Sequence, residues 1–168
     1  LLMRHVFLGE ASPFTDELQA LTGVDYGEMA EKFSAATDVI FTLGNIFRRQ
    51  SGETGLLAEE FDETKRCISE ILSMLRTHTE AKLFVSVSPV PISGYRGKEF
   101  PSVYEADCAS KCQLRAALRY SNGFTYIPTF EIFRWLCAHQ SFPTFGADNQ
   151  NRRHIFPEQI ASVIGLLC

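Results

Sequence analysis

The residue best suited to proton transfer is His154, in the polar stretch DNQNRRHIFPEQ near the end of the sequence. An imidazole titrates near neutral pH, as a general base requires. Asp148, upstream in the same stretch, could orient the ring, and Arg152 could bind an anionic group. The adjacent arginines would also lower the pKa of His154. The residues alone leave two interpretations open, a catalytic base or a solvated loop histidine.

Two further groups of candidates follow short apolar runs. Asn45 comes directly after Gly44, where its amide could donate to an oxyanion while the glycine lets the backbone approach a substrate. A plain Gly-Asn turn is the alternative. Ser86 and Ser88 close the run LFVSVSPVP without the Gly-x-Ser-x-Gly pattern of a nucleophile elbow. We interpret both as hydrogen-bonding residues of a strand end and retain Ser88 as a substrate-binding candidate.

The segment CASKCQLRAAL supplies another candidate, Lys111. With Arg115 four residues later, it could line a pocket for an anionic substrate, although spacing favours a solvated helix face. Ser110 precedes Lys111 directly, so the two should point in different directions rather than form a dyad. Five cysteines without a C-x-x-C pair indicate reduced thiols rather than a zinc site. We expect neither a metal nor a cofactor.

These candidates are positioned by alternating segments. Helical spacing is found at residues 15–39, with Thr15 and Asp16 as caps, and again at 61–78, 103–121 and 157–167, where Pro157 begins the last helix. Continuous apolar runs at 38–44 and 81–91 predict buried strands, the first buried on both faces as in a parallel sheet, and 124–133 is a third strand candidate. Such alternation is typical of an α/β fold with a parallel sheet, in which sites form at the carboxyl ends of the strands.

Length and charge limit the function further. The 168 residues fit one domain, 1–168, and the net charge of −4 argues against nucleic acid as a partner. No apolar run reaches the ~18 residues that span a bilayer. We therefore expect a cytoplasmic protein that binds a small molecule.

Taken together, the motifs resemble the GSCFA-domain family, a bacterial-type branch similar to the SGNH/GDSL hydrolases. The matching blocks are DVIFTLG, LFVSVSPVPIS, ASKCQLRAAL, FTYIPTFEIF and DNQNRRHIFPEQIASVI, from about Asp38 to the C-terminus. The resemblance implies a three-layer, flavodoxin-like α/β fold and acyl-ester chemistry. It also implies that His154 is the base and that Asn45 is a displaced counterpart of the oxyanion asparagine.

The sequence departs from the family pattern in three places. After T-L-G it continues as NIFRRQ, where the family usually runs toward a glutamate and a tryptophan. It lacks the Gly-Ser-Cys-Phe-Ala block that would supply the nucleophilic serine, and Asn151 stands where SGNH hydrolases carry an aspartate before the histidine. We therefore expect an N-terminally incomplete domain, with the serine on a missing segment or a partner chain. Such a domain would be an esterase or acyltransferase for a carbohydrate-like or small ester substrate. The alternative is an inactive α/β module that uses arginines 48, 49, 152 and 153 to bind an anionic ligand or a protein partner.

Overall fold

A parallel three-stranded sheet forms the centre of the molecule. The computed structural model describes residues 20, 23, 25–49, 56–58, 60–92, 95, 97–136, 144–146 and 155–167. The strands β1 (Asp38–Leu43), β4 (Lys82–Val87) and β5 (Thr125–Ile127) lie in the order β1-β4-β5. Helix α4 (Phe61–His78) connects β1 to β4, and α5 (Val103–Leu118) connects β4 to β5. The predicted α/β fold, a parallel sheet flanked by helices, is confirmed.

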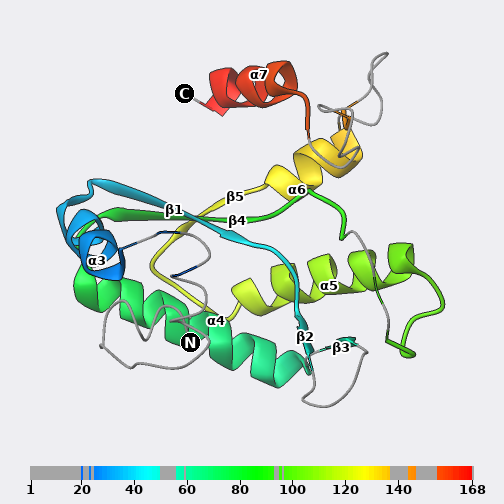
Figure 1. Cartoon of the computed structure of the whole chain (residues 1–168). Helices are drawn as coiled ribbons and strands as arrows, with labels where there is room; N and C mark the ends of the chain where they lie inside the picture. Colours follow the sequence, from blue (N-terminus) through cyan, green and yellow to red (C-terminus); the bar gives the residue numbers. More distant parts are fainter. Residues whose placement is uncertain are drawn as a thin grey trace.

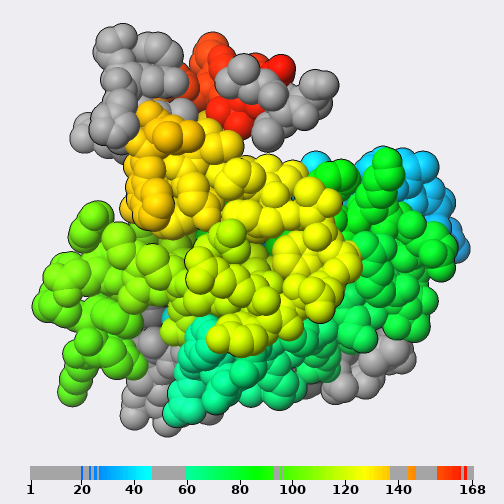
Figure 2. Space-filling model, turned by 180° about the vertical axis from the view of Figure 1, so that it is seen from behind, coloured from blue at the N-terminus to red at the C-terminus, as the bar shows by residue number. Residues whose placement is uncertain are grey.

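Both connecting helices cover the same face of the sheet (Figure 1). The two crossovers step in the same direction across the sheet, and right-handed crossovers in one direction place their helices on one face. Helix α7 (Pro157–Leu167) lies on the opposite side from α4, beyond α6 (Thr129–Glu131) and the π-helical turn η1 (Ile132–Leu136). Figure 2 shows this C-terminal part at one end of the body formed by the sheet, α4 and α5.

The core lies between the sheet and the two connecting helices. Alternate residues of the strands point into it and meet the apolar stripes of α4 and α5, so that removal of apolar surface from water holds the layers together. Its members include Val39, Leu43, Leu83, Val85, Val87, Ile68, Leu72, Leu75, Leu114, Ala117 and Leu118.

Strand β1 differs from the prediction of burial on both faces. Val39 and Leu43 are buried, whereas Ile40 between them is 70% exposed. Successive side chains of a strand point to opposite faces, and α4 and α5 both lie on one of these faces. The continuous apolar run is therefore buried on one side only.

The predicted helices and strands mostly agree with the structure. Helix α4 spans the predicted residues 61–78, and α7 begins at Pro157 as predicted. Within residues 15–39, α3 (Tyr26–Ala35) is helical, with the Asp25 carboxylate accepting from the backbone N of Gly27 at 2.8 Å. The predicted caps Thr15 and Asp16 lie outside the described residues.

Two parts of the prediction were wrong or incomplete. The strand expected over 124–133 ends at Ile127, because Pro128 offers no N–H to the ladder and the chain turns into α6 and η1. A small antiparallel pair, β2 (Phe47–Arg49) with β3 (Leu56–Ala58), was not predicted.

Candidate functional site

The carboxyl ends of β1 and β4 are joined by polar groups. The backbone N of Ser88 donates to the carbonyl of Leu43 at 2.8 Å, which continues the ladder one residue beyond β4. The hydroxyls of Thr42 and Ser86 lie 3.0 Å apart, and Ser88 Oγ accepts from the backbone N of Val90 at 3.3 Å. Both serines thus make hydrogen bonds at the strand end, as predicted.

The loop that follows β1 is held by two neighbouring side chains of α5. Lys111 Nζ donates to the carbonyl of Gly44, and the backbone N of Ile46 donates to Ser110 Oγ at 3.1 Å. Asn45, between the two anchored residues, is exposed. The loop is therefore fixed on both sides of an accessible amide side chain.

One prediction about α5 is wrong. Lys111 is only 1% exposed, not part of a solvated helix face, and Ser110 is also fully buried. The two side chains bond to different residues of the loop after β1, Ser110 to Ile46 and Lys111 to Gly44. The cause is the packing of α5 against the end of the sheet, where the loop passes over the helix and can be reached by both residues.

Helical spacing explains why polar groups are buried here. Asp107, Ser110 and Lys111 lie on the same stripe of α5 as Leu114 and Leu118 further along. The C-terminal half of the stripe packs into the apolar core, and the N-terminal half runs past the ends of the strands. Buried polar and charged side chains need hydrogen-bond partners. The polar residues in the N-terminal half of the stripe therefore have to bond to groups of the neighbouring loop and turn.

Asp107 joins this stripe to the turn η1. Its carboxylate accepts from the backbone N of Ile92 at 3.1 Å and from Arg134 Nη2 at 2.9 Å. The Asp107 side chain is 3% exposed and the Arg134 side chain 16%, so the ion pair is largely buried. Burial lowers the pKa of Lys111, Asp107 opposes that shift, and Arg134 lowers the pKa further. Asp107 thus pairs directly with Arg134 and influences Lys111 through its charge.

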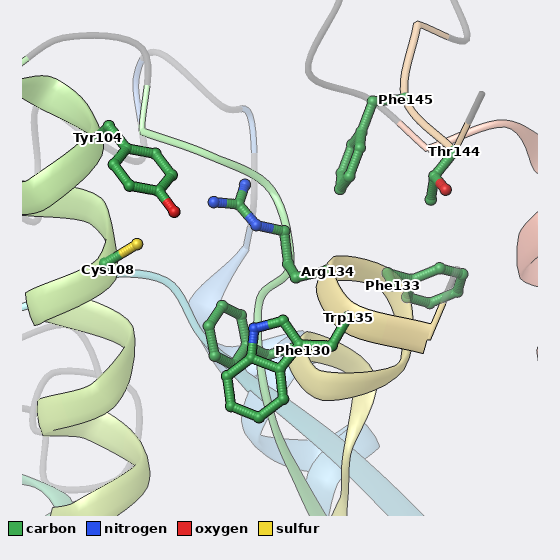
Figure 3. Close-up of a pocket in the computed structure, with 8 residues that line it drawn as sticks. All are labelled: Tyr104, Cys108, Phe130, Phe133, Arg134, Trp135, Thr144 and Phe145. Atoms are coloured by element: carbon green, nitrogen blue, oxygen red, sulfur yellow. The ribbon is translucent and has the colours of Figure 1, made fainter. Parts of the chain in front are cut away.

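A cavity of about 490 Å³ opens beside this ion pair. Tyr104 and Cys108 of α5 line one side, and Arg134 points toward them, with Phe145 across from it (Figure 3). The Arg134 guanidinium carbon lies 5.9 Å from the centre of the Phe145 ring. The thiol of Cys108 raises the pKa of the Tyr104 hydroxyl. The other lining residues are Phe130, Phe133, Trp135 and Thr144.

The C-terminal segment returns to the same cavity. Phe145 forms an antiparallel bridge with Ile155, the residue directly after His154 in the sequence. The backbone N of Phe156 donates to the carbonyl of Thr144 at 3.1 Å. The described residues on both sides of segment 147–154 are thus paired beside the cavity. The predicted residues His154, Asp148 and Arg152 belong to that segment and lie outside the described residues.

A second polar cluster fixes α6 against α5. Arg115 Nε donates to Glu131 Oε1 at 3.1 Å, and the Tyr126 hydroxyl donates to Glu131 Oε2 at 2.8 Å. The Arg115 guanidinium carbon lies 4.0 Å from the centre of the Tyr126 ring. Burial and the bond to Glu131 raise the pKa of Tyr126, while Arg115 opposes the shift. Arg115 is therefore engaged within the protein rather than lining a pocket.

The structure brings some of the predicted residues together and adds others. Gly44 and Lys111 are in direct contact, and Asn45 and Ser88 follow adjacent strands. Asp107 and Arg134 were missed by sequence reasoning. Asp107 could have been identified because it lies at helical spacing from the apolar residues of α5 that face the core. The sequence around Arg134 contains no signal that it is the partner of Asp107.

The described part of the chain shows neither a metal-binding cluster nor a membrane-spanning helix. Its residues contain no group of three or more His, Cys, Asp or Glu side chains placed to hold a metal ion. None of the helices in this part has both the length and the apolar character needed to cross a bilayer.

Fold and site together define an α/β protein with a buried polar cluster and a cavity at the carboxyl edge of a parallel sheet. A model of the GSCFA family matches residues 11–164, and the chain belongs to this family. The match begins well before Asp38, so the similarity extends further toward the N-terminus than the sequence motifs indicated. Comparisons with curated proteins and with solved structures give no match.

Proposed function

We propose that this chain carries the base and the oxyanion-binding part of an SGNH-like esterase or acyltransferase. His154 deprotonates a serine supplied from outside this chain, Asp148 orients the imidazole, and the Asn45 amide donates to the oxyanion. Gly44, Ser88, Lys111 and Arg152 hold the substrate or the loop that binds it. The substrate is a small ester or an acylated carbohydrate-like molecule, and the protein acts in the cytoplasm.

The observation that supports the proposal is a series of links that leads from the loop of Asn45 toward Ile155, the residue after His154 in the sequence. Lys111 holds the loop of Asn45, and Asp107 on the same stripe of α5 pairs with Arg134. Arg134 lies beside Phe145, which pairs with Ile155 next to His154 in the sequence. This series of links supports a site shared by the first strand end and the C-terminal segment.

Two serines at this edge, Ser86 and Ser110, are poorly placed to act as the nucleophile. The Ser110 hydroxyl is fully buried and accepts from Ile46, and Ser86 is 3% exposed and bonded to Thr42. A nucleophile must be exposed and within reach of its base.

A purified protein of natural length, incubated with a short-chain p-nitrophenyl ester, tests the reaction. His154→Ala is expected to reduce turnover by about 10²–10⁴-fold, and Asn45→Ala by about 10²–10³-fold. His78→Ala is the matched control, because His78 lies at the far end of α4, and its turnover should equal that of the parent. Equal turnover of His154→Ala and the parent would remove the catalytic assignment.

A fluorophosphonate probe, which labels activated serines, separates the two candidate functions. Labelling that requires His154 supports the enzyme. A second candidate, the inactive binding module, is favoured by Asn151, which stands where SGNH hydrolases carry an aspartate before the histidine. In that case the natural protein takes up no label and hydrolyses no ester, although it still binds a ligand.

A further inference from the structure

We propose that the cavity between α5 and η1 is a binding site for a small organic acid, or its ester, with an aromatic or short acyl body. Arg134 binds the carboxyl oxygen and the surrounding rings hold the apolar body. As the substrate pocket of the proposed reaction, the site rests on the proposed function. Ligand binding itself is measured without turnover.

The size and lining of the cavity support a small molecule. A volume of about 490 Å³ falls within the usual range for small-molecule sites, roughly 300–1,000 Å³. Most of the lining is aromatic, with single polar groups from Tyr104, Thr144 and Arg134. Such a lining favours a ligand with an apolar body and few polar atoms.

The charge of the site supports a carboxyl group. Among the described residues, Asp107 is the acceptor bound to Arg134, through Nη2. A guanidinium carries five N–H donors, so others remain for a ligand oxygen. An oxygen acceptor from an acid or ester carbonyl matches these donors.

Local backbone geometry places Arg134 at the cavity. It lies in the π-helical turn η1, which follows α6 directly. π-helical turns are rare and occur often at functional sites, where they redirect a side chain. Phe130 and Trp135, whose ring centres lie 6.0 Å apart, form the adjacent wall.

Trp135 gives a direct measurement of binding. It is the only tryptophan of the chain and lines the cavity. Titration with 3-phenylpropionate, under excitation selective for tryptophan, should give a saturable change in fluorescence. 3-Phenylpropionamide, which has the same ring but no charge, should bind about tenfold more weakly, because charge-assisted hydrogen bonds are the stronger ones. The absence of a saturable change with 3-phenylpropionate would overturn the proposal.

Two cysteines provide a matched pair of variants. Cys108 lines the cavity, while Cys112 lies one turn further along α5, is exposed and is not part of the lining. Cys108→Phe places a ring inside the cavity and changes neither residue of the Asp107–Arg134 pair, so it should raise the Kd by about tenfold or more. Cys112→Phe should bind as the parent does. Equal binding by both variants would overturn the site.

Alkylation gives a second measurement on the unmodified protein. Bound 3-phenylpropionate should slow the reaction of Cys108 with iodoacetamide and leave that of Cys112 unchanged. Trypsin cleaves after Lys111 and so separates the two cysteines into peptides 99–111 and 112–115, which mass spectrometry quantifies independently. Equal protection of both cysteines, or of neither, would contradict binding in this cavity.

The role of Arg134 is tested in a variant that removes both charges, Asp107→Asn with Arg134→Met. This protein should bind 3-phenylpropionate and its amide with equal affinity, and a retained preference for the acid would refute the role of the guanidinium.

These experiments distinguish failure of the binding site from failure of the proposed function. If the ligand binds as described but no ester is hydrolysed, the reaction is wrong and the site stands. If Cys108→Phe hydrolyses esters as the parent does, the site is wrong and the reaction stands.

Discussion

Removing Arg134 should strongly destabilise the protein, and removing Asp107 as well should restore most of the loss. The pair is largely buried, and Arg134→Met leaves the Asp107 carboxylate, 3% exposed, without its ion-pair partner. Loss of one partner from a buried pair typically costs about 3–5 kcal/mol of unfolding free energy. Asp107 keeps its bond from the backbone N of Ile92 and the positive field of Lys111, so we expect the lower end, about 3 kcal/mol.

The double variant, Asp107→Asn with Arg134→Met, separates the cost of an unpaired charge from the loss of packing. The introduced asparagine retains a side-chain oxygen that can accept from Ile92, and the introduced methionine retains much of the volume of the arginine. Replacement of both partners is often close to neutral, and Lys111 loses the attraction of Asp107 together with the repulsion of Arg134. The double variant should therefore lie within about 1 kcal/mol of the parent. It should thus be more stable than Arg134→Met alone by about 2 kcal/mol, well beyond additive behaviour.

Urea unfolding followed by circular dichroism measures these differences. With a slope of about 2 kcal/mol per molar urea, Arg134→Met should lower the midpoint by about 1.5 M. Arg66→Met is the control, because Arg66 pairs with Glu63 and Glu70 on the exposed surface of α4, and its midpoint should stay at the parental value. A double variant no more stable than Arg134→Met would refute the argument from an unpaired buried charge.

Three further predictions test the core, the second polar cluster and the loop after β1. Leu75→Ala should cost about 2–5 kcal/mol in thermal or urea unfolding, because Leu75 is fully buried and its truncation leaves a cavity. Stability should fall as pH rises above the ordinary phenol pKa of about 10, because the folded state holds the Tyr126 proton more tightly than the unfolded state does, and Tyr126→Phe should reduce this fall. Ser110→Ala should accelerate hydrogen exchange of the Ile46 amide, which loses its acceptor.

Each of these has its own control. Ile40→Ala, at an exposed position of β1, should change stability little, and a loss equal to that of Leu75→Ala would contradict the assigned core. Tyr120→Phe removes an exposed phenol and should leave the alkaline profile unchanged. If Ile46 exchanges at the same rate with and without the Ser110 hydroxyl, the loop is held by other contacts.

The sequence predicts those elements whose pattern is set locally. The stripe of α4 repeats through Ile68, Leu72 and Leu75, and the structure has the helix at the predicted residues. Pro157 begins α7 because its fixed φ suits a first helical position. The short β5 was not predictable from its apolar run alone, since Pro128 ends the ladder and the aromatic residues that follow are equally compatible with a helix.

The candidate site was predicted in part, because its contacts join residues far apart in the sequence. The loop at Gly44 and the helix at Lys111 were each identified, but their contact depends on how α5 crosses the end of the sheet. Arg134 was missed for the same reason. Its partner Asp107 lies on another element, and only tertiary packing makes the pair.

The burial of polar side chains in the N-terminal half of α5 argues for a role in function rather than in stability. Well-packed apolar residues of similar volume at these positions would often be as stabilising as an ion pair, or more so. The C-terminal half of the same helix uses Leu114 and Leu118 in that way. The polar half instead holds the loop after β1 and the turn that carries Arg134. The position of these charges therefore indicates that they orient the carboxyl edge of the sheet, where the proposed chemistry takes place.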